Sequence, residues 1–209
     1  PRTRLGFLGA LFKNALLHGL HRFAPRLVRS ARRTEVRARL TELSAIYLGL
    51  TYVYYFVDPI KNVLCVLLAT NTCERVGESP QMCKAYSALS VVYGSLARFR
   101  GARAYGESAI ALGEKLEKPR LVGNACALYG TSLFFMAQLE RSRQELERGK
   151  AILAETGDIF ELELCYIHLS YCYLFQGKYR TALETVQAYM GVVESTDSLQ
   201  MGKTLLIHA

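Results

Sequence analysis

The chain has 209 residues and a mass of 23.4 kDa, enough for one domain or a short array of repeats but not for two catalytic domains. Its composition, 51% hydrophobic and 21% charged, excludes a disordered or fibrous protein. The net charge of +8 belongs to one segment: residues 1–39 hold ten Lys and Arg against one acid, whereas residues 40–209 hold sixteen bases against seventeen acids.

The N-terminal segment, residues 1–39, is predicted to be a basic amphipathic cap or linker. Apolar residues recur at helical spacing between Leu5 and Phe23, with cations beside them. Such a helix can lie on an acidic membrane, dock on the first repeat, or connect to an upstream domain. We favour docking. The basic residues after this helix are Arg26, Arg29, Arg32, Arg33, Arg37 and Arg39.

Residues 40–209 are predicted to form a helical repeat domain, because apolar residues recur at helical spacing and strand-like alternation is absent. The uncharged run 43–57 is too short to span a membrane and reads as a buried helix that ends at Asp58-Pro59. Helical pairs are expected near 42–75, 80–116, 120–155 and 159–194. The corresponding repeats are 40–78, 79–118, 119–157 and 158–196, with the start of a fifth at 197–209.

A period of 40 residues supports these boundaries. Three similar phrases begin at Phe99, Leu139 and Tyr179, and a small residue lies nine positions before each of them. A repeated hairpin cannot bury its apolar face alone, so neighbouring hairpins must stack. We therefore expect close helix contacts at the small residues Ser90, Ala102, Gly130, Ser170 and Ala182.

These phrases resemble the tetratricopeptide repeat. The best copy reads Tyr86-Ser-Ala-Leu89-Ser90-Val-Val-Tyr93, then Phe99-Arg-Gly-Ala102, then Ala109. The resemblance covers residues 80–195 well and 42–78 poorly, and its period of 40 is longer than the usual 34. It implies an all-α fold: an α-solenoid of about four antiparallel helix hairpins.

A second resemblance concerns the leader Leu20-His-Arg-Phe23-Ala-Pro25, which precedes an Arg-rich stretch and the repeats. This order is similar to the repeat tail of large bacterial signalling proteins that join a kinase or nucleotide-cyclase domain to a signal-transduction ATPase.

The tetratricopeptide resemblance also implies a concave groove lined by the first helix of each hairpin. Four positions per copy would point inward: Ser44, Tyr47, Thr51 and Tyr54; Lys84, Ser87, Val91 and Gly94; Asn124, Ala127, Thr131 and Phe134; Leu164, Ile167, Tyr171 and Leu174. The residues that we assign to partner binding are Tyr47, Tyr54, Lys84, Ser87, Asn124, Thr131, Phe134, Ile167 and Tyr171. The alternative is a groove filled by another helix of the same protein.

Catalysis finds little support in the sequence, and we expect no catalytic residue, metal ion or cofactor. Cys165, His168 and Cys172 share one helical face, but a tetrahedral zinc site needs a fourth ligand, and none is near in sequence. A packed core face is the favoured interpretation. The six cysteines follow no disulfide framework, which predicts buried free thiols in the cytoplasm.

The sequence thus predicts a non-catalytic scaffold or sensor module that binds a protein, a peptide or another domain of its own chain. It would be a fragment of a larger cytoplasmic signalling protein. The alternative is a module that recruits a membrane or a nucleic acid through residues 1–39. No nucleic-acid partner is expected, and membrane contact is the less favoured outcome.

Overall fold

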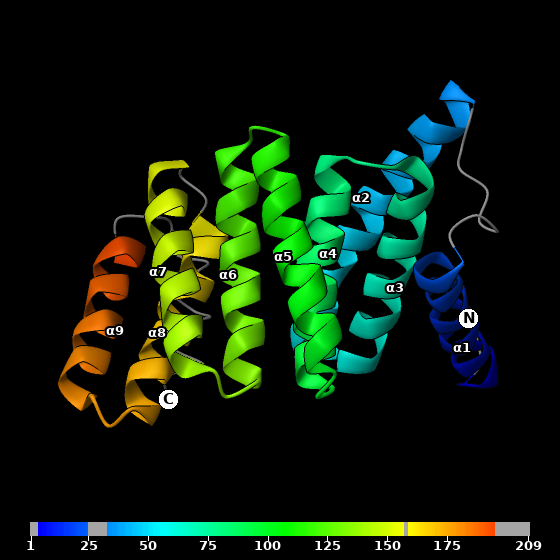
Figure 1. Ribbon diagram of the computed structural model, residues 1–209. Helices are drawn as coiled ribbons and strands as arrows, with labels where there is room; N and C mark the ends of the chain where they lie inside the picture. Colours follow the sequence, from blue (N-terminus) through cyan, green and yellow to red (C-terminus); the bar gives the residue numbers. More distant parts are fainter. Residues whose placement is uncertain (1–3, 25–32, 157–158, 195–209) are drawn as a thin grey trace.

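The computed structural model describes residues 4–24, 33–156 and 159–194, and within these ranges it is all-α (Figure 1). Nine helices and no strand lie in the described residues. Their bounds are α1 Arg4–Phe23, α2 Thr34–Val57, α3 Pro59–Val76, α4 Pro80–Ser95, α5 Phe99–Lys115, α6 Pro119–Phe135, α7 Leu139–Thr156, α8 Ile159–Phe175 and α9 Tyr179–Glu194.

The helices from α2 to α9 form four hairpins stacked in chain order, which confirms the expected solenoid of helical hairpins (Figure 1). Each hairpin packs on the next, and the first helices α2, α4, α6 and α8 also pack side by side. One boundary differs from expectation. Helix α2 begins at Thr34, so the division predicted between residues 39 and 40 falls inside a repeat helix. The fifth repeat at 197–209 lies outside the described residues.

The helices end at a regular interval of 20 residues, half the sequence period. A residue with positive φ follows the helix at Gly77, Ala97, Glu117, Ala137 and Gly177. At four of these ends the next amide donates back across the turn, at 2.8–3.3 Å: Arg98 N to Tyr93 O, Lys118 N to Gly113 O, Gln138 N to Leu133 O and Lys178 N to Tyr173 O. Such left-handed caps satisfy the last carbonyls of a helix. These described caps are separated by 20 or 40 residues, in phase with the 40-residue period.

Two helices, α3 and α4, have their first turn capped by a side chain. Asp58 Oδ1 accepts from Lys61 N at 3.1 Å at the start of α3, and Ser79 Oγ accepts from Met82 N at 3.2 Å at the start of α4. Each cap is followed by a proline in the first turn, where its missing N–H costs no hydrogen bond.

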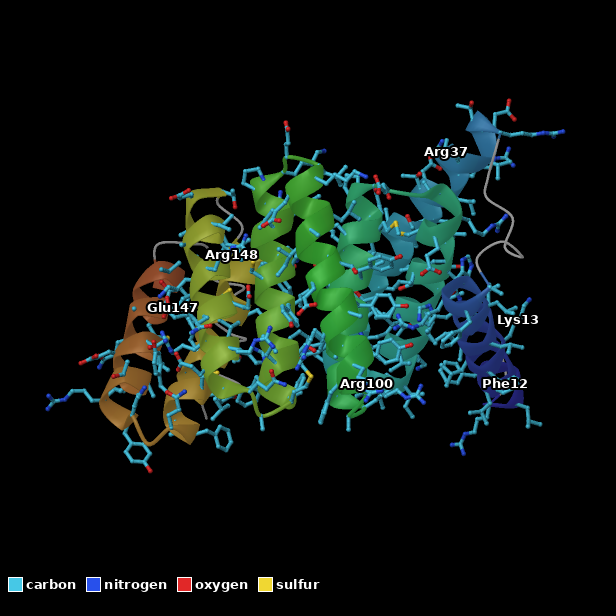
Figure 2. All side chains as sticks on the ribbon, viewed as in Figure 1. Phe12, Lys13, Arg37, Arg100, Glu147 and Arg148 are labelled. Atoms are coloured by element: carbon cyan, nitrogen blue, oxygen red, sulfur yellow. The ribbon has the colours of Figure 1, made fainter. Side chains whose placement is uncertain are left out.

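The small residues predicted at the helix contacts are all buried. Ser90 Oγ donates to Ala102 O at 2.8 Å, which joins α4 to α5. One period later the roles are exchanged, and Ser142 Oγ donates to Gly130 O at 2.7 Å. A Cβ at Gly130 would lie 2.6 Å from Leu146 Cγ, so this contact admits no side chain. On the outer surface, Arg148 of α7, labelled in Figure 2, forms an ion pair with Glu114 of α5 at 2.7 Å.

All six cysteines are free and buried in these helices, as the sequence predicted. Burial raises the pKa of Cys73 and of Cys83 to about 11 and that of Cys126 to about 12. Thiols with such pKa values are poor nucleophiles at neutral pH, which fits a packing role.

No helix in the described ranges has the length and apolar character needed to cross a bilayer.

Candidate binding pocket between the first helices

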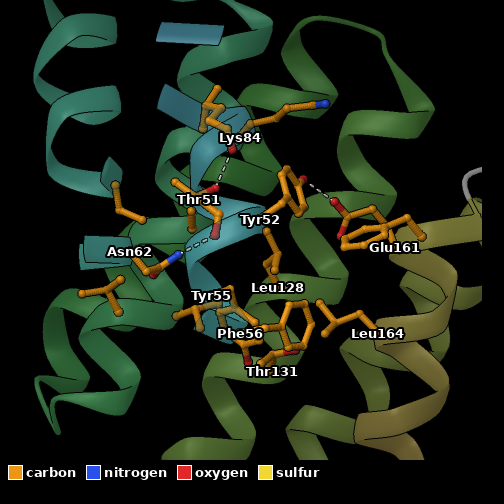
Figure 3. Close-up of a pocket in the computed structure, with 16 residues that line it drawn as sticks. Thr51, Tyr52, Tyr55, Phe56, Asn62, Lys84, Leu128, Thr131, Glu161 and Leu164 are labelled. Atoms are coloured by element: carbon orange, nitrogen blue, oxygen red, sulfur yellow. Dashed lines mark hydrogen bonds between the residues drawn. The ribbon is translucent and has the colours of Figure 1, made fainter. Parts of the chain in front are cut away.

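A pocket opens on the face built by the first helices of the hairpins (Figure 3). It encloses about 700 Å³, including the part that opens to solvent. Helices α2, α3, α4, α6 and α8 all contribute to its wall, which is mostly apolar. The lining residues are Leu48, Thr51, Tyr52, Tyr55, Phe56, Asn62, Val66, Lys84, Ala88, Val91, Val92, Leu128, Thr131, Phe160, Glu161 and Leu164.

Helix α2 reaches across this face to α8 by side-chain contact. Tyr52 OH donates to Glu161 Oε1 at 2.5 Å, and the rings of Tyr52 and Phe160 meet edge-on with centroids 5.1 Å apart. Helices α4 and α6 lie between α2 and α8 in the row, so contact between its two ends means that the row curves. The pocket is therefore concave, and this contact narrows the groove from within the chain.

The polar atoms of the pocket wall are mostly engaged by the protein itself. Asn62 Nδ2 donates to Thr51 O at 2.7 Å, and Thr51 Oγ1 donates to Leu48 O at 2.6 Å. Thr131 Oγ1 donates to Ala127 O in the same way. Lys84 is the one cation of the wall, and within the described residues it forms no ion pair. In Figure 3 its amino group points away from Tyr55 and Phe56, which separates the charge from these two rings.

The inward residues inferred from the resemblance coincide only in part with this wall. Five of the sixteen positions line the pocket, namely Thr51, Lys84, Val91, Thr131 and Leu164. Elsewhere the wall uses the next residue along the helix: Tyr55 in place of Tyr54, Ala88 in place of Ser87, and Leu128 in place of Ala127. The helices are thus rotated relative to the inferred register.

Close packing between neighbouring helices explains why the wall uses the next residue along the helix. Ser87 and Ala127 are fully buried, and Ala127 packs with the α7–α8 core around Leu146, Leu153 and Leu169. Ser87 Oγ donates to Cys83 O of its own helix. Small residues at these positions let neighbouring helices approach closely, so the next residue faces the groove.

Other residues assigned to partner binding also lie outside the pocket wall. Tyr47 packs on the cluster of Leu48, Ala69, Cys73 and Ala85, and Tyr54 lies under the Lys61 amino group, 5.6 Å from its ring centre. Asn124 is buried, with its Oδ1 atom unpaired. Ile167 is half-buried on α8.

Phe134 and Tyr171, also assigned to the groove, form an aromatic cluster with His168 and Phe175. The rings of Phe134 and Tyr171 stack with centroids 6.0 Å apart, and His168 meets both of them edge-on. His168 Nδ1 lies 3.0 Å from Leu164 O. Burial lowers the pKa of His168 to about 4, so this imidazole is neutral at physiological pH.

The face of Cys165, His168 and Cys172 is a packed surface, as favoured from the sequence. Both cysteines belong to the core cluster with Leu162 and Leu169. In the described part of the chain, no group of three or more His, Cys, Asp or Glu side chains is placed to hold a metal ion.

Helix α1 docks on the repeat domain through a mixed face, on which Leu11 packs against the core cluster of Val66 and Leu89 and polar side chains meet partners. Tyr105 OH and His18 Nε2 are 3.1 Å apart, His21 Nδ1 and Glu74 Oε2 are also 3.1 Å apart, and Asn71 Nδ2 donates to Asn14 O at 3.0 Å. Burial lowers the pKa of His18 to about 4 and raises that of Glu74 to about 7.

Within the basic segment, Arg33, Arg37 and Arg39 are exposed at the start of α2. Arg26, Arg29 and Arg32 lie outside the described residues.

Comparison with known proteins identifies no relative: no protein-family model matches this sequence, and no curated protein matches it closely.

Proposed function

We propose that this chain is a non-catalytic interaction module that binds an apolar segment of a protein or peptide in the pocket between its first helices. The observation that supports this function is the pocket itself, an apolar concavity in which Lys84 is the cation and Tyr55 and Phe56 are exposed aromatic surface. Concave sites lined by apolar and aromatic side chains with a few polar groups are typical binding sites.

The shape of the pocket favours a short apolar anchor over an extended strand or helix. The contact between Tyr52 and Phe160 closes the groove on one side, so a long helix could not lie along the whole row of first helices. A segment with one or two large apolar residues and a neighbouring carboxylate would match the aromatic wall and Lys84. Tyrosine and phenylalanine offer large rigid contact area at low entropy cost, which is why such residues dominate binding energy.

The tetratricopeptide-like identity of the repeats belongs to this proposal. The 40-residue period, the stacked hairpins and the buried small residues support it. We further propose that the module is part of a larger cytoplasmic signalling protein and couples its ligand to an enzymatic domain. Six buried free thiols agree with a reducing compartment.

The test is selection of ligands from a random peptide library displayed on phage, followed by calorimetric titration of the selected peptides. Tyr55→Ala should weaken binding by about 1–3 kcal/mol because it removes an aromatic wall. Ala88→Phe should weaken it too, by filling the pocket. Leu183→Ala, at an exposed position of α9, is the matched control and should bind like the parent chain.

Salt gives a second criterion. Binding through apolar contacts should persist from low to moderate salt, whereas binding through the basic segment should collapse. The proposal fails if selected peptides bind all three variants equally well. It also fails if Arg33→Ala with Arg37→Ala abolishes binding while Tyr55→Ala does not.

A further inference from the structure

Helix α1 presents its apolar face to solvent. Leu5, Leu8, Phe12, Leu16, Leu20 and Phe23 lie on one side of the helix and are all exposed, with Phe12 at 73% and Phe23 at 84%. The opposite side carries His18, which is 3% exposed, and docks on α3 and α5. The docked face is mixed, with Leu11 packed on the core beside Asn14 and His18, and the continuous row of leucine and phenylalanine is the exposed one. An exposed apolar stripe of this length on a docked helix marks an interaction surface.

Cations flank this stripe on both sides. Lys13 lies on one flank, and Arg4 and Arg22 lie on the other, at helical positions roughly 100° from the stripe centre. Residues 1–34 contain no acid at all. Figure 2 shows Phe12 and Lys13 on the side of α1 that faces away from α3.

The turn between α4 and α5 extends this surface beside the C-terminal end of α1. Leu96 and Phe99 are exposed there, next to the exposed Arg98 and Arg100. An open pocket lies between this turn and α1, and three arginines line it: Arg22, Arg98 and Arg100. No carboxylate lines it.

The first turn of α5 adds positive potential to this pocket. Helix α5 begins at Phe99, has no acid in its first turn, and has no side-chain cap on its first amides. Uncapped amides at a helix start favour a nearby anion. Three arginines and this helix end together make the pocket suited to a phosphate group.

We propose that the outward face of α1, with the α4–α5 turn, binds the surface of an anionic membrane. The leucines and phenylalanines enter the boundary between headgroups and acyl chains, and a lipid phosphate occupies the pocket between Arg22, Arg98 and Arg100. An apolar stripe flanked by cations, lying in the plane of the interface, is the pattern of peripheral membrane helices.

Charge complementarity selects this occupant. A second copy of the chain would bring the same cationic face, so like charges would oppose pairing. The described cations of this face are Arg4, Lys13, Arg22, Arg98 and Arg100. An anionic bilayer supplies both the negative charge and the apolar phase that this surface lacks. This binding is independent of the pocket between the first helices, which lies on other surfaces of the hairpins.

The experiment is sedimentation of the 209-residue chain with two kinds of vesicles, pure phosphatidylcholine and phosphatidylcholine with about one third phosphatidylglycerol. We expect binding to the anionic vesicles to be about tenfold or more stronger than to the neutral ones. Phe12→Ser with Leu16→Ser should weaken it about tenfold or more, because apolar area drives insertion. Arg98→Gln with Arg100→Gln should weaken it and reduce its dependence on salt.

The matched controls lie at the opposite end of the stack, on α9. Leu183→Ser and Arg180→Gln, alone and together, remove an exposed leucine and an exposed arginine and should leave vesicle binding unchanged. All substituted side chains are exposed, so the thermal midpoint of each variant should match that of the parent chain.

Four results would overturn the proposal. The first is equal binding to neutral and anionic vesicles, or no binding to either kind. The second is unchanged binding by Phe12→Ser with Leu16→Ser, which would reduce the interaction to unspecific charge. The third is displacement of bound chain by inorganic phosphate, which would make the pocket a site for a free anion. The fourth is a dimer in sedimentation velocity that the same double variant converts to a monomer without any vesicle binding.

Discussion

The middle hairpins and helix α1 use glycine and apolar residues in opposite ways. In the middle, a Cβ at Gly106 would lie 2.1 Å from the Tyr129 ring, and one at Gly149 would lie 3.0 Å from Ala127 N. In α1, a Cβ at Gly9 or Gly19 would meet nothing within 4 Å. The apolar residues differ likewise, since those of the middle hairpins are largely buried and those of α1 are largely exposed.

This contrast separates residues that maintain the stack from residues available to a partner. Where helices meet at a distance that only glycine, alanine or serine permits, the sequence is constrained by packing. Where a helix has room for larger residues and still exposes leucine and phenylalanine, packing within the chain does not explain them. Three sets of substitutions test the packing of the stack through stability.

The largest effect is expected from Gly130→Leu. The new side chain would overlap Leu146, which is fully buried, so helices α6 and α7 must separate. We expect a loss of about 3 kcal/mol or more in the free energy of unfolding, measured by denaturant titration. Gly49→Leu is the matched control, because a Cβ at Gly49 meets nothing within 4 Å. An unchanged thermal midpoint for Gly130→Leu would show that the assigned contact register is wrong.

A smaller effect is expected from the protonation of His168. Its pKa falls from the ordinary 6.5 to about 4 in the fold because the imidazole is buried. Below pH 6.5 the unfolded chain takes up a proton that the folded chain does not, so stability is lost as the pH falls toward 4. Between pH 7 and pH 4.5, the parent chain should lose about 2–3 kcal/mol more than His168→Phe does.

That comparison uses chemical unfolding of both proteins at the two pH values. Equal losses in the parent chain and in His168→Phe would mean that the histidine is solvated or paired in the fold. His18 also has a pKa lowered to about 4, and it remains in both proteins, so its contribution cancels.

The smallest effect is a gain. Ala97 and Ala137 hold φ values of 56° at the ends of α4 and α6, in the left-handed region that favours glycine. Ala97→Gly and Ala137→Gly should each raise the free energy of unfolding by about 0.5–1 kcal/mol. Gly177→Ala, at the equivalent end of α8, should lower it by a similar amount. A loss of stability in both glycine variants would contradict the assigned helix ends.

The sequence predicted the fold well because the 40-residue period and the caps are local signals. The pairs of helices, the stop at Asp58 and the buried small residues at Ser90 and Gly130 all follow from local sequence and spacing. The wall of the groove was harder to predict from the sequence. Its wall depends on the rotation of each helix, and that rotation is set by contacts such as Ala127 with Leu146, which no spacing rule contains.

Two features had no signal in the sequence. Tyr52 and Glu161 are 109 positions apart, and their hydrogen bond depends on the summed curvature of three hairpin contacts. The orientation of α1 was equally inaccessible, because its amphipathic pattern alone would favour burial of the apolar face. On the opposite face Leu11 packs on the core of α3 and α4. His18, Asn14 and His21 of that face have partners on α3 and α5.

Hydrogen exchange measured by mass spectrometry, on the chain alone and with anionic vesicles, tests the division between stack and interaction surface most directly. In the free chain, amides of α4 to α7 should exchange slowly and those of α1 faster, because α1 packs on one side only. Vesicles should slow exchange in α1 and the α4–α5 turn and leave α7 and α9 unchanged. Slowing confined to α7 and α9, or no slowing anywhere, would contradict the account.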